Sequence, residues 1–441
     1  MIATLILSLA ALQSGAALPQ GTPTQSSLGG TFVTPFAPSL QAGVLPGRML
    51  EITMNLPGQL WQETFVIGIP QIVQYPAPVL TLFHGYGEEP RDVIANTPLV
   101  ADAMARGWIV FIPLGAHKFN YGIEYAQRNI ELSFQFLNTR LPIDLDRIYS
   151  VGFSMGGGAA ASFAARHLDP NGIRFAALVN HTGTTSLRAT YHTSNDTGLF
   201  ESPLMFGASP AMNPFPYLQS STIDLDPFTG LVDPAGEMAS NLTHIPTRHW
   251  NANFDPNQTI IDQTVALHER MSMRGADTAR SIVTSSIHSW GTLDSATVLD
   301  WLALQSLHTP VPGEVTKTVA DRDGRWHDLE IVQAQSGALT PVMWSSQPVS
   351  NALYLIEMAN IGSIGIDVTE VALDPMQSLI VILQTTDAST PDVVLEGFPS
   401  IPSDVKRRGI STSAWTHDAV AQTVTLHESG PMGWAAWTII P

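Results

Sequence analysis

The run Gly152-Phe153-Ser154-Met155-Gly156 is the feature that most restricts how this chain can fold. An apolar segment, 147–151, precedes the run, and a segment of small residues, 157–161, follows it. This order predicts a strand, a sharp turn and a helix, with the Ser154 hydroxyl exposed above the N-terminus of the helix. The glycines suit this turn because side chains would collide where strand and helix approach each other. Ser154 is therefore a candidate nucleophile.

Apolar strands and helical patterns alternate on both sides of this turn. The short apolar runs 79–83, 108–112 and 175–179 are typical of strands buried on both faces, and helical spacing separates them. The same alternation resumes over 246–306. It predicts an α/β fold with a doubly wound, mostly parallel sheet covered by helices on both faces.

Composition shifts predict the domain organisation of the 441 residues. Residues 1–17 read as a signal peptide, with a buried N-terminal strand as the alternative because no basic residue precedes the apolar core. Residues 18–47 are rich in Ser, Thr, Gly and Pro and read as a linker or N-terminal arm. The α/β domain is expected over 48–308, with a lid-like insertion at 186–245, and an all-β sandwich accessory domain over 314–441. The signal peptide predicts a secreted or periplasmic protein.

Charge and residue usage exclude several classes of partner and chemistry. The net charge of −18 disfavours nucleic acid and anionic membranes as partners. The N-terminal apolar segment is too short for a membrane span. Cysteine is absent, so disulfides and thiolate chemistry are excluded, and the 13 histidines show no metal-ligand spacing. We expect no metal and no cofactor, and the oligomeric state stays open.

A serine nucleophile needs a base, and His288 is the preferred candidate. It directly follows the strand-like run 281–287 and precedes a helical pattern. His268 lies on a helical pattern, His249 within a predicted strand and His308 in the domain linker, so packing or exposure explains each of them.

The base needs an orienting carboxylate, and Asp255 fits this role best. It ends the strand-like run 248–254, and Pro256 prevents the strand from continuing. A turn-forming Asp-Pro pair is the structural alternative. Asp262 is the second candidate, and the weaker candidates lie in the insertion: Asp224, Asp226 and Asp233.

A tetrahedral intermediate needs backbone donors aimed at its oxyanion. The turn geometry supplies the Met155 N–H, and the loop His84-Gly85-Tyr86-Gly87, after an earlier strand, supplies the Tyr86 N–H. His84 is expected to bind backbone carbonyls. Trp290 and His181 are tentative substrate contacts. Burial of Trp290 against the following helix is equally compatible with the sequence, and a hydrogen-bonded loop position is the commoner outcome for a histidine such as His181.

These motifs, F-H-G-Y-G, G-F-S-M-G-G-G, N-F-D-P and H-S-W, resemble those of the α/β-hydrolase superfamily over about residues 50–306. The likeness is nearest to secreted esterases of the polyhydroxyalkanoate-depolymerase, feruloyl-esterase and dienelactone-hydrolase-like groups. The nucleophile motif is also similar to that of cutinases and polyester hydrolases. The resemblance implies a carboxylic ester hydrolase acting through a Ser-His-Asp triad, with polyester or aromatic esters as substrates. The chain departs from the cutinase pattern in its longer Ser154–Asp255 gap and its lack of cysteines.

Two rival functions share this fold. A serine peptidase of the prolyl-oligopeptidase type has the same triad order, but its accessory domain is an N-terminal propeller. A non-catalytic binding protein on the same fold is the second rival. The sandwich domain also offers exposed or core tryptophans as candidates for binding a polymer surface: Trp326, Trp344, Trp415, Trp434 and Trp437.

Overall fold

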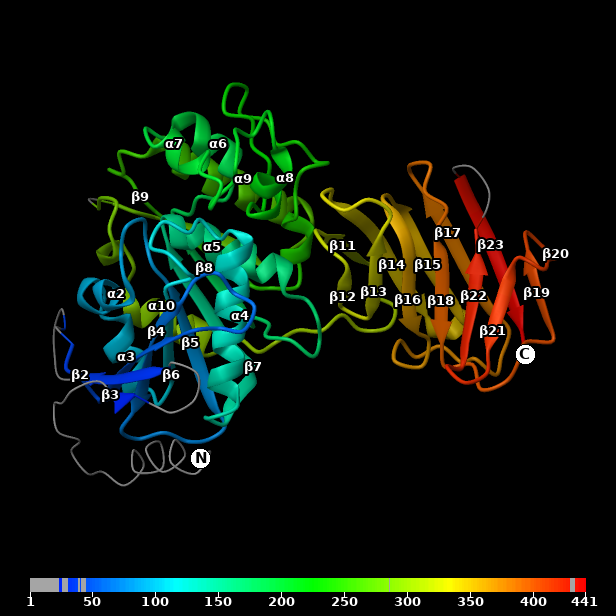
Figure 1. The fold of residues 1–441 in the computed structure, drawn as a ribbon, viewed down its shortest axis with the longest axis horizontal. Helices are drawn as coiled ribbons and strands as arrows, with labels where there is room; N and C mark the ends of the chain where they lie inside the picture. Colours follow the sequence, from blue (N-terminus) through cyan, green and yellow to red (C-terminus); the bar gives the residue numbers. More distant parts are fainter. Residues whose placement is uncertain (1–23, 26–30, 39, 41–44, 285, 429–432) are drawn as a thin grey trace. The chain divides into compact units, whose positions relative to one another are not determined.

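The structure is a computed structural model that describes residues 24–25, 31–38, 40, 45–284, 286–428 and 433–441. The expected signal peptide, 1–17, lies outside these residues. The chain divides into two compact units. The first runs to Ala165 and resumes at Ile173–His308, and the second comprises Arg166–Gly172 and Thr309–Pro441 (Figure 1).

A mixed sheet forms the centre of the first unit. Its described strands are β1 Thr24–Gln25, β2 Phe32–Phe36, β3 Gly47–Met54, β4 Glu63–Pro70, β5 Ala77–Phe83, β6 Ile109–Pro113, β7 Ile143–Phe153, β8 Ala177–His181, β9 Thr247–Ala252 and β10 Thr278–Val283. They are ordered β1-β2-β3-β4-β6-β5-β7-β8-β9-β10. Strands β5 to β10 pair in parallel, whereas β1 to β4 pair antiparallel and β4 joins β6 antiparallel. The expected mostly parallel α/β sheet is therefore confirmed.

Part of the segment expected as a linker or arm, 18–47, is a strand instead. Residues Phe32–Phe36 form β2, which pairs antiparallel with β3. The side chain of Phe36 packs against the core of the unit, and the guanidinium of Arg91 lies over its ring. The aromatic and β-branched residues of this stretch therefore extend the sheet, despite the Gly- and Pro-rich sequence around them.

Helices cover both faces of the sheet, which explains its continuous apolar strands. They are α2 Pro90–Asn96, α3 Leu99–Ala105, α4 Glu124–Asn138, α5 Met155–Arg166, α9 Gln258–Met273 and α10 Ser295–Leu302. Strand β6 shows the alternation: Val110 and Ile112 join a core with residues of α3 and α10. Phe111 faces the other side, where its ring lies 4.4 Å from that of Phe134 on α4. No helix within the described ranges has both the length and the apolar character needed to cross a membrane.

The insertion 186–245 has short helices and a core of its own. Its elements are α6 Leu187–Thr193, α7 Thr197–Phe200, α8 Pro214–Gln219 and the 3₁₀ helix η1 Ala239–Leu242. The rings of Phe200, Phe206 and Tyr217 pack with Met155 in one apolar cluster. This cluster therefore lies against the first turn of α5, next to Ser154.

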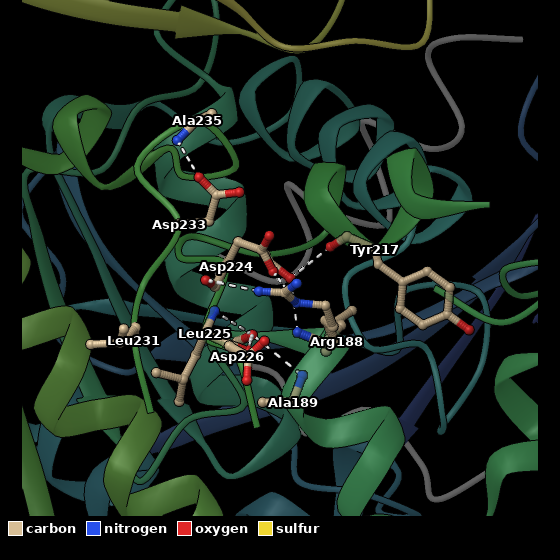
Figure 2. Close-up of polar contacts among 12 residues, drawn as sticks. Arg188, Ala189, Tyr217, Asp224, Leu225, Asp226, Leu231, Asp233 and Ala235 are labelled. Atoms are coloured by element: carbon tan, nitrogen blue, oxygen red, sulfur yellow. Dashed lines mark hydrogen bonds and ion pairs between the residues drawn. The ribbon is translucent and has the colours of Figure 1, made fainter. Parts of the chain in front are cut away.

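A charge pair lies inside the insertion. Figure 2 shows the guanidinium of Arg188 facing the carboxylate of Asp224, with Nε 2.7 Å from Oδ1. Burial raises the pKa of Asp224 to about 6, although Arg188 opposes the shift. Asp226 accepts hydrogen bonds from the N–H groups of Phe228 and Thr229. Asp233 accepts a hydrogen bond from the N–H of Ala235. These three aspartates, the weaker candidates for the orienting acid, therefore have local roles.

The second unit contains two facing β-sheets, as expected for a sandwich. Its strands are β11 Thr316–Ala320, β12 Gly324–Trp326, β13 Leu329–Gln333, β14 Thr340–Gln347, β15 Ala352–Met358, β16 Ile361–Asp367, β17 Leu379–Thr385, β18 Asp392–Glu396, β19 Asp404–Arg407, β20 Ile410–Ser411, β21 Trp415–Asp418, β22 Thr423–His427 and β23 Gly433–Ile440. Among the described residues, one sheet is ordered β11-β14-β15-β17-β23-β19-β20 and the other β12-β13-β16-β18-β22-β21. Both sheets contribute to one apolar core, which also contains Leu168. Beside Leu168, Arg166 forms a fully buried ion pair with Asp321, at 2.6 Å.

Candidate active site

Ser154 stands in a sharp turn between β7, which ends at Phe153, and α5, which begins at Met155. Its backbone has a φ of 55°, a left-handed conformation that is unusual for a residue with a side chain. A Cβ on Gly152 would collide with the backbone of Gly156, and one on Gly156 would collide with the carbonyl of Phe83. The expected strand, turn and helix are therefore present, and the glycines have the steric role that the sequence predicted.

Three side chains that are far apart in the sequence meet at this turn. Nε2 of His288 lies 2.9 Å from Oγ of Ser154, and Nδ1 of the same ring lies 2.6 Å from Oδ2 of Asp255. Asp255 follows the end of β9, and His288 lies in the loop after β10. The structure therefore brings together the predicted nucleophile, base and orienting acid in one hydrogen-bonded series.

The environment of Asp255 keeps its carboxyl group ionised. Burial by itself would raise the pKa of Asp255, but hydrogen bonds from His288 and from the N–H of Asn257 outweigh it, and the pKa is lowered. An ionised carboxylate can accept a hydrogen bond from Nδ1 of the histidine tautomer whose Nε2 is an acceptor toward Ser154. Asp262, the second candidate, instead accepts a hydrogen bond from Gln258 on α9.

The two predicted oxyanion donors are backbone amides of Met155 and Tyr86. Among the described residues, neither amide has a protein acceptor. The loop that carries Tyr86 is held by His84, whose ring nitrogens lie 2.9 Å from the carbonyls of Gly85 and Leu114. His84 therefore has the structural role that we expected for it.

His181 and Trp290 do not have the positions that substrate contacts would need. His181 is 0% exposed, and its ring nitrogens lie 2.8 Å from the carbonyl of Ser289 and 3.2 Å from that of Trp250. Burial lowers its pKa, although both carbonyl contacts oppose this shift. Trp290 is 2% exposed and packs in the core. The expectation of substrate contact is therefore wrong for both residues, because strand β8 and the loop of His288 turn these side chains inward.

Aromatic side chains lie beside the loop 84–87, which carries the predicted donor Tyr86 and is called the oxyanion loop below. The ring of Tyr86 is 40% exposed and lies 4.5 Å from that of Phe119 and 5.8 Å from that of Tyr121. The Tyr86 hydroxyl donates a hydrogen bond to Asp196 of the insertion. The resemblance to cutinases also implies that Tyr86 flanks the acyl group, whereas Phe119 has no sequence signal beyond its aromatic character.

Metal-ligating side chains do not gather at this site. In the part of the chain that the structure describes, no group of three or more His, Asp or Glu side chains could hold a metal ion. The residues around Ser154 fit covalent chemistry by the serine itself.

The strand order, the Ser154 turn and the triad order Ser154, Asp255, His288 decide the fold. The first unit has the α/β-hydrolase fold. No protein-family model and no curated protein matches the sequence.

Several solved structures resemble the chain at low identity. An S-formylglutathione hydrolase from Agrobacterium tumefaciens is 14% identical, with a TM-score of 0.45, over 59% of this chain and 96% of that one. A ferulic acid esterase is 15% identical, with a TM-score of 0.40, over 58% of this chain and 95% of that one. An acylaminoacyl peptidase from Pyrococcus horikoshii is 12% identical, with a TM-score of 0.44, over 66% of this chain and 50% of that one. These scores add nothing to the fold assignment, which depends on the topology and the site.

Proposed function

We propose that the protein is a serine hydrolase that cleaves carboxylic esters through an acyl-enzyme intermediate. The observation that carries this proposal is the continuous hydrogen-bonded series from Ser154 Oγ through His288 to Asp255. A serine hydroxyl is a weak nucleophile unless a base removes its proton and a third group orients that base. Both conditions are met by these three residues.

The reaction would proceed in two halves. Ser154 Oγ attacks the ester carbonyl while Nε2 of His288 takes the hydroxyl proton, and the carbonyl oxygen becomes an oxyanion. The amides of Met155 and Tyr86 stabilise that charge. The tetrahedral intermediate then collapses, the C–O bond to the alcohol breaks, and His288 returns the proton to the leaving alcohol. Water, deprotonated by the same ring, hydrolyses the acyl-Ser154 ester and releases the acid.

We propose that the preferred substrates are aromatic esters or polyesters. The exposed ring of Tyr86 and the partly exposed ring of Phe119 beside it support this, since an aromatic surface next to an oxyanion donor favours stacking with planar groups, whereas Tyr121 is buried. Feruloyl, terephthalate and hydroxyalkanoate esters are the relevant test compounds.

We also propose that the protein is exported. N-terminal sequencing of the protein recovered from its host would test this by showing cleavage after Ala16 or Ala17.

A panel of p-nitrophenyl, feruloyl, hydroxyalkanoate and terephthalate esters tests the reaction, and an aminoacyl-proline amide tests the peptidase alternative. We expect ester turnover that Ser154→Ala abolishes. Ser272→Ala, a change on an exposed position of α9, is the matched control and should behave like the wild type. Activity retained by Ser154→Ala would refute the assignment, and faster cleavage of the amide than of any ester would favour the peptidase.

A further inference from the structure

The carboxylate of Glu88 connects two loops of the site. Its Oε2 accepts a hydrogen bond of 2.7 Å from the N–H of Gly85 and one of 3.0 Å from the indole N–H of Trp290. Its Oε1 accepts a third hydrogen bond, of 2.8 Å, from the side-chain amide of Asn96 on α2. Hydrogen bonds to an ionised carboxylate are shorter and stronger than those between neutral groups. The carboxylate is therefore held in one orientation.

Both partners of Oε2 lie next to residues of the proposed mechanism. Gly85 immediately precedes Tyr86, whose amide is an oxyanion donor, and Trp290 is two residues after His288. The ring of Phe153, the residue before Ser154, lies 5.3 Å from that of Trp290 and 4.6 Å from that of His288. The nucleophile turn, the oxyanion loop and the base loop therefore converge around Glu88 and Trp290.

We infer that Glu88 is a positioning residue, which fixes the Tyr86 amide relative to the Ser154–His288 pair. This inference rests on the proposed function. An oxyanion donor stabilises the transition state only if it lies close to the position where the charge develops, and a displacement of about 1 Å can cost about 100-fold in rate. Without Glu88, the turn of Gly85 and the loop of Trp290 lose their common acceptor. The effect is then on the transition state and not on the binding of substrate.

Three variants test this role. Glu88→Ala removes all three hydrogen bonds, whereas Glu88→Gln keeps an oxygen that can accept from both Gly85 and Trp290. Trp290→Phe removes one donor and keeps an aromatic ring in the core. Glu89→Ala is the control, because this neighbouring side chain belongs to the capping box of α2 and, unlike Glu88, is not an acceptor shared by Gly85 and Trp290.

The measurements are kcat and KM for a p-nitrophenyl ester, the rate of Ser154 labelling by a fluorophosphonate, and the unfolding midpoint. We expect Glu88→Ala to lower kcat and the labelling rate about 10- to 100-fold, with KM changed less than about threefold. Glu88→Gln should restore most of the rate, and Trp290→Phe should lie between the two. Glu89→Ala should lower the unfolding midpoint slightly and leave both rates unchanged.

Two outcomes would overturn the role of Glu88: labelling and kcat within twofold of the wild type in Glu88→Ala, or equal losses in Glu88→Gln and Glu88→Ala. If Glu88→Ala does not fold, unchanged rates in Trp290→Phe would overturn it in the same way. Labelling does not depend on which ester is the substrate. A wild-type protein that is labelled at Ser154 but hydrolyses no ester would therefore refute the proposed function and still test Glu88.

Discussion

The hydroxyl of Tyr86 donates a 2.8 Å hydrogen bond to Oδ2 of Asp196. Tyr86 belongs to the oxyanion loop, and Asp196 is the residue before helix α7 of the insertion. Burial, together with this hydrogen bond and the charge of Asp196, raises the pKa of Tyr86 to about 12. The phenol therefore stays protonated and remains a donor throughout the neutral pH range, so the insertion is attached to the oxyanion loop.

Removing this hydroxyl should loosen helix α7. Tyr86→Phe keeps the ring and the amide of residue 86 but loses a hydrogen bond worth about 1 kcal/mol, or about a fivefold change in an equilibrium. We expect the backbone amides of Leu199 and Glu201, which donate hydrogen bonds to the carbonyls of Asp196 and Thr197, to exchange hydrogen about fivefold faster. Tyr125→Phe, at an exposed position of α4, is the control and should not change their exchange. Equal exchange in both variants would show that the hydrogen bond does not hold the insertion.

Asp255→Asn should lower kcat by about 1,000-fold or more. An amide in this position can donate to Nδ1 of His288 and so favours the tautomer that cannot accept the Ser154 proton. Asp262→Asn, the change at the exposed second candidate, should keep the wild-type kcat. A large loss in Asp262→Asn with a small one in Asp255→Asn would contradict the triad assignment.

Glu63→Gln should alter the pH dependence of stability. Glu63 is fully buried and accepts hydrogen bonds from backbone N–H groups of 114–116 and from Asn129. Burial raises its pKa from 4.5 to about 7, even though these hydrogen bonds oppose the shift. The folded state therefore binds more protons than the unfolded state between these pH values, and its stability falls as pH rises through this window.

The size of this effect can be checked by urea unfolding at pH 4.5, 6 and 8. Below the unfolded pKa of Glu63, its contribution to the free energy of unfolding is fully present. On the order of 3 kcal/mol of this free energy is lost by pH 8. Glu63→Gln should lack this part of the decline. Glu269→Gln removes one exposed carboxylate from α9 and should keep the wild-type profile. The same pH profile in both variants would contradict the shifted pKa.

Gly156→Ala should destabilise the first unit by about 1–3 kcal/mol or more, because the new methyl group would collide with the carbonyls of Phe83 and His84. Backbone atoms cannot move aside as a flexible side chain would. Gly198→Ala is the matched control, since a Cβ there has nothing within 4 Å. Chemical denaturation of both variants measures the difference, and equal stabilities would contradict the steric explanation for the glycine.

The tryptophans of the second unit should separate into core and surface positions. Trp437 is buried and Trp434 is 61% exposed, although they are three residues apart on β23. Trp437→Ala should cost about 3–5 kcal/mol of stability. Trp434→Ala should leave stability unchanged and weaken adsorption to an insoluble polyester if the sandwich binds polymer surfaces. Unchanged adsorption would exclude Trp434 from such a role.

The proximity of Ser154, Asp255 and His288 could be predicted from sequence because each of them follows a recognisable strand. Ser154 stands between an apolar run and a small-residue helix, and Asp255 and His288 follow the strands β9 and β10. Parallel strands place their carboxyl ends at one edge of a sheet, so three local signals suffice to bring these residues together.

Contacts between distant side chains could not be predicted in this way. Glu88 and Trp290 are 202 residues apart, and no local pattern links a loop carboxylate to a particular indole. Between the apolar runs 79–83 and 108–112, helical spacing predicts helix but does not show that the segment forms two helices, α2 and α3, separated at Thr97 and Pro98. His181 is the last residue of β8, and its ring contacts the carbonyl of Ser289 from a loop 108 residues away, which no local pattern predicts.

The buried ion pair between Arg166 and Asp321 has a consequence for the order of synthesis. The two residues are 155 positions apart, so the ribosome releases Arg166 and Leu168 long before the strands that will surround them. At a synthesis rate of about 5–20 residues per second, the interval between the synthesis of Arg166 and that of Asp321 is on the order of ten seconds. In the folded unit, this buried arginine and leucine are surrounded by strands that are synthesised later. The sandwich therefore includes 166–172 as well as the C-terminal strands, and we expect its transfer to another protein to require 166–172 as well.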